Sequence, residues 1–382
     1  MEIEMPLILT DDQIMIRDSA DGFFKDETPV SQHRALRDAK DPIGFSRDAW
    51  AKMAEMGFAG VLVPEAHGGA DMGHVAAGII MEAMGKNLSA APMLSTAVLG
   101  ATALKHGTPE QQAKYLPLIA KGAHLLALAA DEAARHKPNH VAATAAPSGN
   151  GFKLNGVKGF VLDGQAADTL IVAARTGGET GDKAGITLFL VNPKADGVTI
   201  GRRSMVDSRG AARVTLSDVQ VDGADVLGAV GEGFAILEKM LDAGRACLAA
   251  EMLGVSGTSF AMTVDYLKQR EQFGQKIGSF QALQHRAAHL FCEIELARSA
   301  TLKALQALDE GSDRAPMFVS LAKAKAGEVA ILASNEGVQM HGGIGMTDDY
   351  DIGFFMKRAR AAQETFGDAA FHSDRIARTL GY

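Results

Sequence analysis

The stretch that decides how this chain folds is REQFGQKIGSFQALQH, residues 270–285, and a shorter one, QMHGGIG, follows at residues 339–345. In the first stretch, Arg270 offers a planar fork of donors that matches a diphosphate. Phe273 offers an aromatic face for an adenine or a ribose, and Gln281 offers an amide that hydrogen-bonds beside it. Together these side chains favour a dinucleotide site.

The second stretch supports the same interpretation through its glycines. Gly342 and Gly343 lack side chains, so a backbone N–H can approach the ADP portion of a dinucleotide closely. Glycine is also favoured directly after a helix, and that role is compatible with the first. Arg270 alone could be a surface ion pair, but Gln281 and Gln339 beside it favour nucleotide binding.

Both stretches lie in a region with a helical period that runs from about residue 227 to the end. Residues 317–340 form one long helix, closed by the two glycines. A second helix carries apolar residues in steps of three and four along one face: Leu283, Ala287, Leu290, Ile294 and Ala297. Long helices this rich in Ala and Leu suit a four-helix bundle.

Upstream of the bundle the period changes to that of strands. Asn155-Gly156, between apolar runs, predicts a two-residue hairpin. Apolar runs predict strands over residues 170–174, 186–191 and 212–221. We therefore expect a β domain here.

The N-terminal third again predicts helices. Thr10 with Gln13 predicts a capping box, and Thr108-Pro109-Glu110 opens another helix. Residues 75–84 and 91–106 read as buried helices. The expected fold class is thus α+β, mainly α, with an N-terminal α-helical domain (1–125), a middle β domain (126–226) and a C-terminal helical bundle (227–382).

Composition excludes several classes of protein. A chain of 382 residues fits two or three packed domains, and its net charge of -8 argues against a general nucleic-acid binder. Cys247 and Cys292 are too few for a disulfide framework and read as buried small hydrophobes in a reducing compartment. No basic leader is evident, and no apolar run approaches about 18 residues. We expect a cytoplasmic protein with no membrane span and no metal.

The order of domains and the two bundle stretches resemble the acyl-CoA dehydrogenase family across nearly the whole chain. Residues 57–69 and 107–122 match the same pattern. Within the family the likeness is to small subunits of the pimeloyl-CoA dehydrogenase type, which share LQHRAA (283–288) and the Phe-Gly-Asp tail (366–368). The resemblance implies FAD as cofactor, an acyl-CoA substrate, and a bundle that holds the FAD of a neighbouring subunit.

On this resemblance, Phe160 takes the place of the family's tryptophan beside the flavin, and Asp368 that of its flavin-contacting threonine. Arg245 is assigned to the substrate. The family's Thr-Glu-Pro is here Asp131-Glu132-Ala133, which removes a hydroxyl donor to the flavin ring. The cofactor-binding residues implied are Arg270, Gln272, Phe273, Gln281, Gln339, Gly342, Gly343, Phe160 and Asp368.

The sequence departs from the family at the catalytic base. In the family, a carboxylate removes the α-proton of the thioester while flavin N5 takes the β-hydride. The usual glutamate position is Phe366, and the alternative position, just before Arg245, is Gly244. Asp368, Glu364 and Glu251 are the nearest carboxylates, and each is several ångströms from the reach of about 3 Å that a base needs.

Three hypotheses therefore remain open. In the first, the chain is an FAD-associated subunit that lacks the glutamate and pairs with a related chain that carries it, in a heterotetramer. In the second, it is an autonomous homodimeric or homotetrameric dehydrogenase with Asp368, Glu364 or Glu251 as a relocated base. In the third, it is a non-catalytic assembly subunit without flavin. The acyl chain and the electron acceptor are not specified by the sequence.

Overall fold

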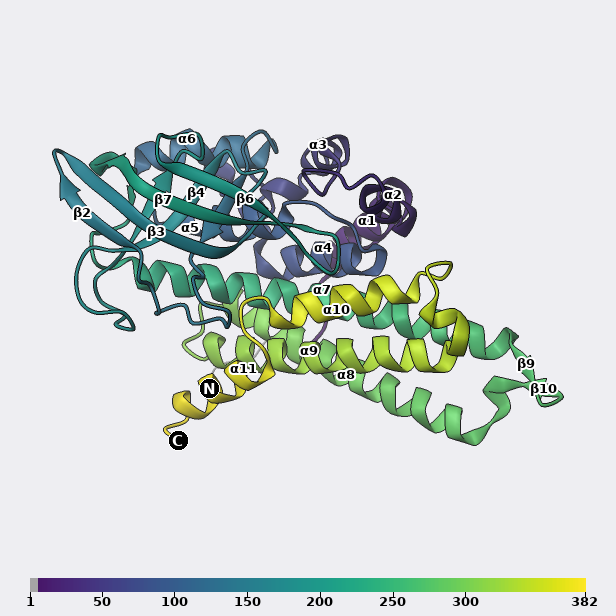
Figure 1. The fold of residues 1–382 in the computed structure, drawn as a ribbon. Coiled ribbons are helices and arrows are strands. Elements are labelled where there is room, and N and C mark those ends of the chain that lie inside the picture. Colours follow the sequence, from purple (N-terminus) through teal and green to yellow (C-terminus); the bar gives the residue numbers. More distant parts are fainter. Residues whose placement is uncertain (1–5) are drawn as a thin grey trace. The chain divides into compact units, whose positions relative to one another are not determined.

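The computed structural model describes residues 6–382 (Figure 1). The chain divides into two compact units, each built from segments that are distant in sequence. Unit 1 comprises Met1–Ala35, His74–Ser89 and Arg245–Tyr382, and unit 2 comprises Leu36–Gly73 and Ala90–Gly244.

Unit 1 is helical, and its long helices form the expected bundle. Helices α8 and α9 run side by side (Figure 1), and α10 and α11 pack against α9. Leu290, Ile294 and Ala297 of α8 are buried against Val329 and Ala333 of α9, which confirms the predicted apolar face. The elements are α1 (Asp11–Glu27), α2 (Val30–Asp38), α4 (Gly73–Asn87), α7 (Gly233–Gln269), β9 (Glu271–Gln272), β10 (Gln275–Lys276), η5 (Ile277–Ser279), α8 (Gln281–Asp309), α9 (Ala315–His341), η6 (Gly342–Met346), α10 (Ile352–Glu364) and α11 (Ala369–Thr379). Of these, α2 after Ala35 and α7 before Arg245 are counted with unit 2.

Helices α4 and α7 cross with their backbones in close contact, and two glycines make this possible. A Cβ on Gly85 of α4 would lie 2.1 Å from the carbonyl oxygen of Glu251 on α7. A Cβ on Gly254 of α7 would lie 2.0 Å from the carbonyl oxygen of Glu82 on α4. Neither position has room for a side chain, so both require glycine.

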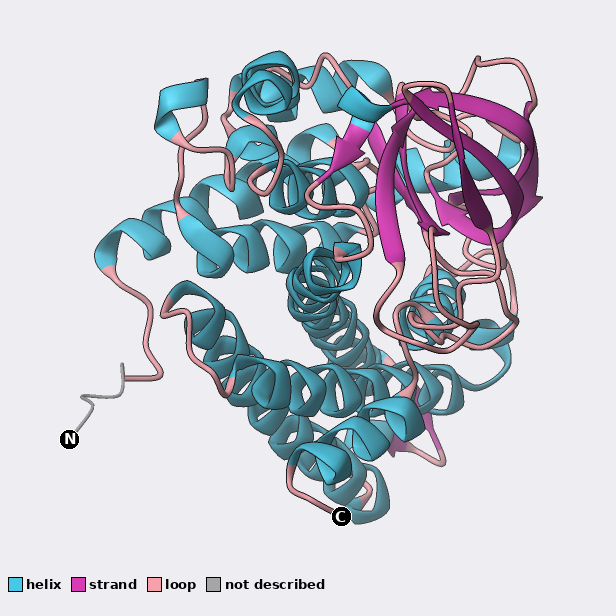
Figure 2. Ribbon diagram, turned by 90° about the vertical axis from the view of Figure 1, so that its left-hand side faces the viewer, coloured by secondary structure: helices cyan, strands magenta, loops and turns pink. Residues whose placement is uncertain are grey.

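Unit 2 contains a mixed sheet (Figure 2) with short helices before it. The strand order is β6-β7-β3-β2-β4-β5-β8, and β1 pairs in parallel with β4. The strands are β1 (Leu126–Ala129), β2 (Thr144–Ser148), β3 (Gly151–Leu162), β4 (Thr169–Arg175), β5 (Ile186–Val191), β6 (Val198–Ser204), β7 (Gly210–Asp222) and β8 (Val226–Leu227). The other elements are α3 (Arg47–Glu55), η1 (Phe58–Gly60), η2 (Glu65–His67), η3 (Met93–Gly100), α5 (Ala101–Leu104), α6 (Pro109–Ala120) and η4 (Gly223–Asp225).

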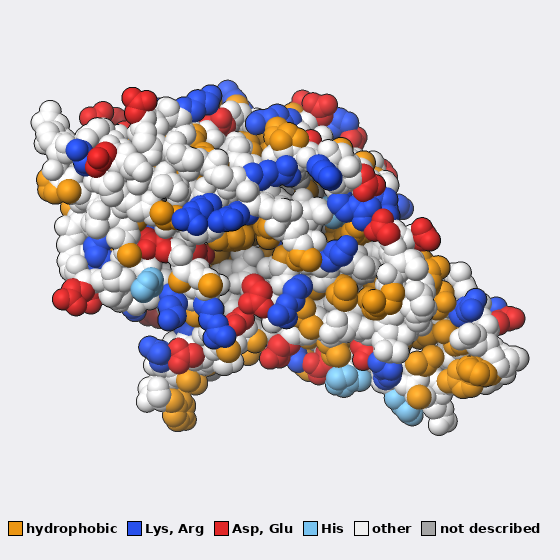
Figure 3. All heavy atoms as spheres, viewed as in Figure 1, with side chains coloured by type: hydrophobic (Ala, Val, Ile, Leu, Met, Phe, Trp, Pro, Cys, Tyr) orange, Lys and Arg blue, Asp and Glu red, His pale blue; other side chains and the backbone are white. Residues whose placement is uncertain are grey.

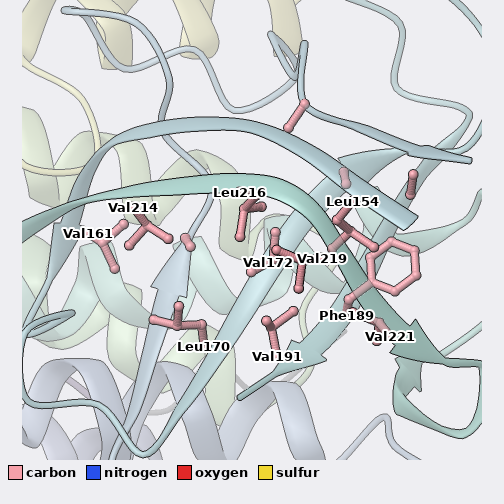
Figure 4. Close-up of a cluster of buried hydrophobic side chains, with 14 of the residues drawn as sticks. Leu154, Val161, Leu170, Val172, Phe189, Val191, Val214, Leu216, Val219 and Val221 are labelled. Carbon is pink, nitrogen blue, oxygen red and sulfur yellow. The ribbon is translucent and has the colours of Figure 1, made fainter. Parts of the chain in front are cut away.

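The core of this sheet consists of aliphatic side chains that alternate along the strands. Leu154 and Val161 of β3 face Leu170 and Val172 of β4, with Phe189 of β5 beside them (Figure 4). The strands predicted over residues 170–174, 186–191 and 212–221 are confirmed as β4, β5 and β7.

The hairpin predicted at Asn155-Gly156 is wrong. Strand β3 runs straight through this dipeptide, and the turn lies earlier, where Ser148 pairs with Gly151 and Gly149 has φ of 58°. Gly156 instead marks a bulge: its φ is 149°, the register against β7 shifts there, and a Cβ would lie 2.5 Å from that of Ala143. A positive φ and a close approach call for glycine in a bulge as strongly as in a turn.

Most predicted helices are present, with one change of type. Thr10 and Thr108 each form a complete capping box, with Gln13 and Gln111 as partners. Residues predicted as one helix over 91–106 form a π-helix, Met93–Gly100, followed by the short helix α5.

Two further expectations about apolar residues need correction. Cys247 is buried, and burial raises the pKa of its thiol, but Cys292 is exposed on α8 and is not a core residue. Within the described residues, α7 is long and apolar enough to cross a membrane by length and composition, although no such segment was expected. Because 67% of its most apolar window is buried inside the protein, α7 has the burial of a core helix.

Candidate functional site

Seven of the nine predicted cofactor-binding residues lie at one end of the bundle in unit 1, whereas Phe160 lies in unit 2 and Asp368 caps α11. Arg270 directly follows α7, and strands β9 and β10 form a small hairpin whose tip carries Phe273, which is 88% exposed. Hydrophobic side chains are visible at this end in Figure 3, at the lower right. We call the following exposed residues the bundle-end patch: Arg270, Gln272, Phe273, Gln281, Gln339, Gly342 and Gly343.

A small apolar cluster beneath the patch brings its pieces together. Leu267 of α7, Ile277 of η5 and Met340 of α9 are buried against one another, with Phe280 and Leu283 packed beside them. Residues 270–285 and 339–345 are therefore neighbours in space, as the sequence predicts.

The glycines of the patch fit the approach of a nucleotide. Gly342 caps α9 with φ of 64°, a conformation that favours glycine. A Cβ built on Gly342 or Gly343 would meet no described atom within 4 Å, so this stretch of backbone is open to a ligand. With one guanidinium and three amides nearby, the donor set fits the ADP portion of a dinucleotide cofactor.

His341, next to these glycines, has a packing role. Its ring lies 4.5 Å from the ring of Tyr266 and 4.6 Å from that of Tyr350. Its Nδ1 lies 2.6 Å from the carbonyl oxygen of Gly337, and burial lowers the pKa of the imidazole.

Phe366 lies in a tight turn between α10 and α11 that buried cations hold. Its side chain is 5% exposed and its φ is 59°. Arg245, fully buried, donates from Nε to the carbonyl oxygen of Phe366 at 3.1 Å. Lys323 donates to the carbonyl oxygens of Gln363 (2.9 Å) and Gly367 (3.0 Å). The backbone at Phe366 is thus fixed from two sides.

Lys323 is an unusual cation because its side chain is fully buried. Burial, reinforced by the positive charge of Arg245, lowers the pKa of Lys323 to about 7. Its bond to the carbonyl oxygen of Gln363, in the last turn of α10, also satisfies a group that has no partner within the helix.

The three carboxylates considered as relocated bases are engaged elsewhere. Glu251 is fully buried and forms a two-point ion pair with Arg358, at 2.8 and 2.7 Å. Asp368 caps α11 by accepting from the backbone N–H of Phe371 at 2.8 Å. Glu364 is half exposed and lies 3.7 Å from Arg360 on the surface. None of the three is held ready to accept a proton from a substrate.

In unit 2, half-buried Phe160 lies beside the Asp131-Glu132 segment. Phe160 and Asp131 form an isolated antiparallel bridge. Glu132 accepts from the backbone of Ala142 and Ala143, and from buried Lys158 at 2.6 Å. Burial lowers the pKa of Lys158 despite that carboxylate. This pair was not predicted; its signal in the sequence is a lysine on the inward face of a strand with alternating side chains.

A helical bundle that presents a guanidinium, three amides and an open glycine turn at one end defines a candidate dinucleotide-binding protein. Three family descriptions match the chain: "Acyl-CoA dehydrogenase, N-terminal domain" at residues 10–123, "middle domain" at 127–223 and "C-terminal domain" at 231–381. The chain belongs to the acyl-CoA dehydrogenase family, whose members are FAD-dependent oxidoreductases. Both the predicted fold class and the predicted FAD are thereby confirmed.

Individual relatives agree with the family assignment. A "3-(aryl)acrylate reductase" of Clostridium sporogenes is 33% identical over 355 residues, 91% of this chain and 92% of that protein. Butyryl-CoA dehydrogenase of Megasphaera elsdenii has a similar structure, with a TM-score of 0.90 and 27% identity over 98% of this chain and all of that one. A chain of the ChsE4–ChsE5 complex of Mycobacterium tuberculosis has a TM-score of 0.88 and 27% identity over 98% of this chain and 99% of that one.

Proposed function

We propose that this chain is a subunit of an FAD-dependent acyl-CoA dehydrogenase and that a related chain supplies the catalytic carboxylate. The reaction is the α,β-dehydrogenation of an acyl-CoA thioester. The similar chain from the ChsE4–ChsE5 complex supports a pairing of two family members. The small-subunit type suggested by LQHRAA and the Phe-Gly-Asp tail, and a cytoplasmic location, belong to the same proposal.

The observation that carries the proposal is the environment of Phe366. The resemblance places the family's base at this position, and here a phenyl ring is buried on a backbone fixed by Arg245 and Lys323. A phenyl ring neither accepts nor donates the α-proton. With Glu251 paired to Arg358 and Asp368 used as a helix cap, the carboxylate has to come from elsewhere.

The chain's own residues have defined tasks in this scheme. When bound, FAD supplies the hydride acceptor. The bundle-end patch binds its ADP portion: Arg270 to the diphosphate, and Gln281 and Gln339 as flanking hydrogen-bond partners. The resemblance puts Phe160 and Asp368 near the flavin. Arg245, fully buried, acts as a positioning residue for the Phe366 turn rather than as a direct substrate ligand.

The test is anaerobic bleaching of the flavin by a panel of acyl-CoAs. The isolated chain, loaded with FAD, is expected to keep its oxidised spectrum, and a mixture with a base-carrying family chain is expected to bleach. The variant Phe366→Glu restores a carboxylate at the position and is expected to bleach alone, whereas Phe366→Leu, the matched control, is not.

Each alternative has a distinct outcome in the same assay. Rapid bleaching of the isolated wild-type chain would refute the missing-base proposal. Its loss in one of Asp368→Asn, Glu364→Gln or Glu251→Gln would then identify a relocated base. A preparation that assembles fully but retains no FAD would favour the non-catalytic assembly subunit.

A further inference from the structure

We propose that unit 1 contains a second ligand site, separate from the bundle-end patch, that binds a medium-chain amphiphile with an anionic head. The site is a cavity of about 450 Å³ between α4, α7, α8 and the segment Leu7–Leu9. It shares no residue with the bundle-end patch, and it goes beyond the function proposed above.

The cavity is lined mainly by hydrocarbon. Val75 and Ile79 of α4, Ala250 and Leu253 of α7, and Leu305 of α8 contribute apolar side chains. The cavity is partly open to solvent, since its lining includes Leu7 and Ile8, which are 49% and 67% exposed. Its volume falls within the range of about 300–1,000 Å³ that is typical of small-molecule pockets.

The helices around the cavity are held apart by their own contacts. At Gly78 of α4, a Cβ would lie 2.4 Å from a methyl carbon of Leu305, so α4 and α8 already touch there. Helix α7 is in direct contact with α4 as well, through the backbone approaches at Gly85 and Gly254. Because these contacts are direct, the helices cannot move together to fill the cavity.

One side of the cavity is closed by a short chain segment. Leu7, Ile8 and Leu9 line it, and Gln306 of α8 donates to the carbonyl oxygen of Pro6 at 2.9 Å, which holds the segment in place. Leu7 is 49% exposed and Ile8 is 67% exposed, so the cover is thin. A ligand that enters here exchanges exposed apolar surface for buried surface.

The charged lining residues point to the chemistry of the head group. They comprise Arg17, Lys86, Arg298 and Glu82. Lys86 is held by both oxygens of Asp21 at 2.8 Å, and Arg298 is 2.7 Å from Glu82. Two of the three cations are therefore already paired by residues from other helices.

Among the described lining residues, Arg17 is the cation that is not paired with a residue of another helix. It pairs with its chain neighbour Asp18 at 3.0 Å, and both side chains are well exposed. Exposed pairs of this kind contribute little, so an incoming carboxylate can displace Asp18 at small cost and bind the guanidinium at two points. The ligand class is therefore a medium-chain carboxylate whose hydrocarbon body packs against the apolar lining.

The experiment is calorimetric titration of the FAD-loaded full chain with decanoate. We expect one saturable site per chain, and a loss of about fourfold in affinity for each methylene removed in the series to octanoate. Ala250→Phe and Leu302→Trp, which fill the cavity from different helices, are expected to weaken binding at least tenfold. Leu296→Trp, at a leucine of α8 that is 58% exposed and lies outside the cavity lining, is the matched control and should leave decanoate affinity unchanged.

The head group is tested separately. Arg17→Gln should weaken binding of decanoate by about tenfold and leave that of 1-decanol unchanged, since only the carboxylate uses the guanidinium. Cosedimentation with vesicles of an anionic phospholipid tests whether the chain binds a lipid surface instead of a free carboxylate. If the chain sediments with the vesicles but does not bind decanoate, the proposal is overturned. Decanoate that binds both filled variants as tightly as wild type, or that is displaced mole for mole by an acyl-CoA, would also overturn it. If Ala250→Phe fails to fold, Leu302→Trp alone decides.

Discussion

The buried pair of Glu251 and Arg358 gives a prediction that separates structural from catalytic roles. The glutamate side chain is 0% exposed and the arginine 5%, and two hydrogen bonds of 2.8 and 2.7 Å join them. Removing one partner of such a pair leaves a buried charge uncompensated, at a cost of about 3–5 kcal/mol. Replacing both partners by apolar residues of similar volume is often close to neutral.

We therefore expect Glu251→Gln to lower the free energy of unfolding by about 3 kcal/mol, at the low end because the amide oxygen still accepts one hydrogen bond. Arg358→Met should cost about 3–5 kcal/mol, and the double variant Glu251→Leu/Arg358→Met should fall within about 1 kcal/mol of wild type. The coupling between the two sites would then be several kcal/mol.

Urea unfolding followed by helical circular dichroism measures these differences. Trp50, the sole tryptophan of the chain, lies in unit 2, so its fluorescence reports on that unit as an internal control. A loss below about 1 kcal/mol for Glu251→Gln, or a double variant as unstable as the sum of the singles, would refute the reasoning. If Glu251→Gln instead abolished flavin bleaching with full stability, Glu251 would be the base.

Three further predictions concern a buried amine, a helix crossing and the cofactor. The pKa of Lys323 is about 7 in the folded protein against an ordinary 10.5, so between these values the unfolded state binds more protons and stability should rise with pH. Lys323→Met should lose that rise in urea titrations at pH 6.5, 8 and 9.5, and equal slopes would contradict the assignment. Gly85→Ala should cost at least about 2 kcal/mol because its Cβ would lie 2.1 Å from a backbone oxygen of α7. In contrast, Gly257→Ala on α7, where no described atom lies within 4 Å, should gain up to about 1 kcal/mol; similar thermal shifts in both would be inconsistent with the crossing. Arg270→Gln should weaken FAD binding about 10- to 100-fold in equilibrium dialysis, whereas Arg286→Gln on α8, paired with Glu336, should not.

Local signals predicted the fold well because their physics is local. The capping boxes at Thr10 and Thr108 depend on side chains three residues apart, so the sequence contains both partners. The same locality misled at Asn155-Gly156, since a bulge and a hairpin both need a glycine with positive φ. Which of the two forms depends on pairing with β7, some 60 residues further along, and no local pattern encodes that. The domain boundaries at residues 125 and 226 remain predictions.

The candidate site likewise has a part that local sequence patterns predict and a part that they do not. The bundle-end patch was predictable because its two stretches each carry a motif and both lie at helix ends. The partner of Glu251 was not, because Arg358 lies 107 residues away on another helix. The hydrogen bonds from Arg245 and Lys323 to the Phe366 turn were not predictable for a different reason. Their acceptors are main-chain carbonyl oxygens, which every residue has, so no residue type marks them in the sequence.

The interleaved composition of the two units has a consequence for how the protein is made. Unit 1 draws on three segments, Met1–Ala35, His74–Ser89 and Arg245–Tyr382. During synthesis, α1 and α4 therefore emerge long before α8, α9 and the other C-terminal helices of the same unit. Unit 2 is complete at Gly244 and can fold first. The apolar faces of α1 and α4 stay exposed until the last third of the chain has been synthesised. A nascent chain halted near residue 250 would thus combine a folded sheet with unprotected helices, and it should be a preferred client of chaperones.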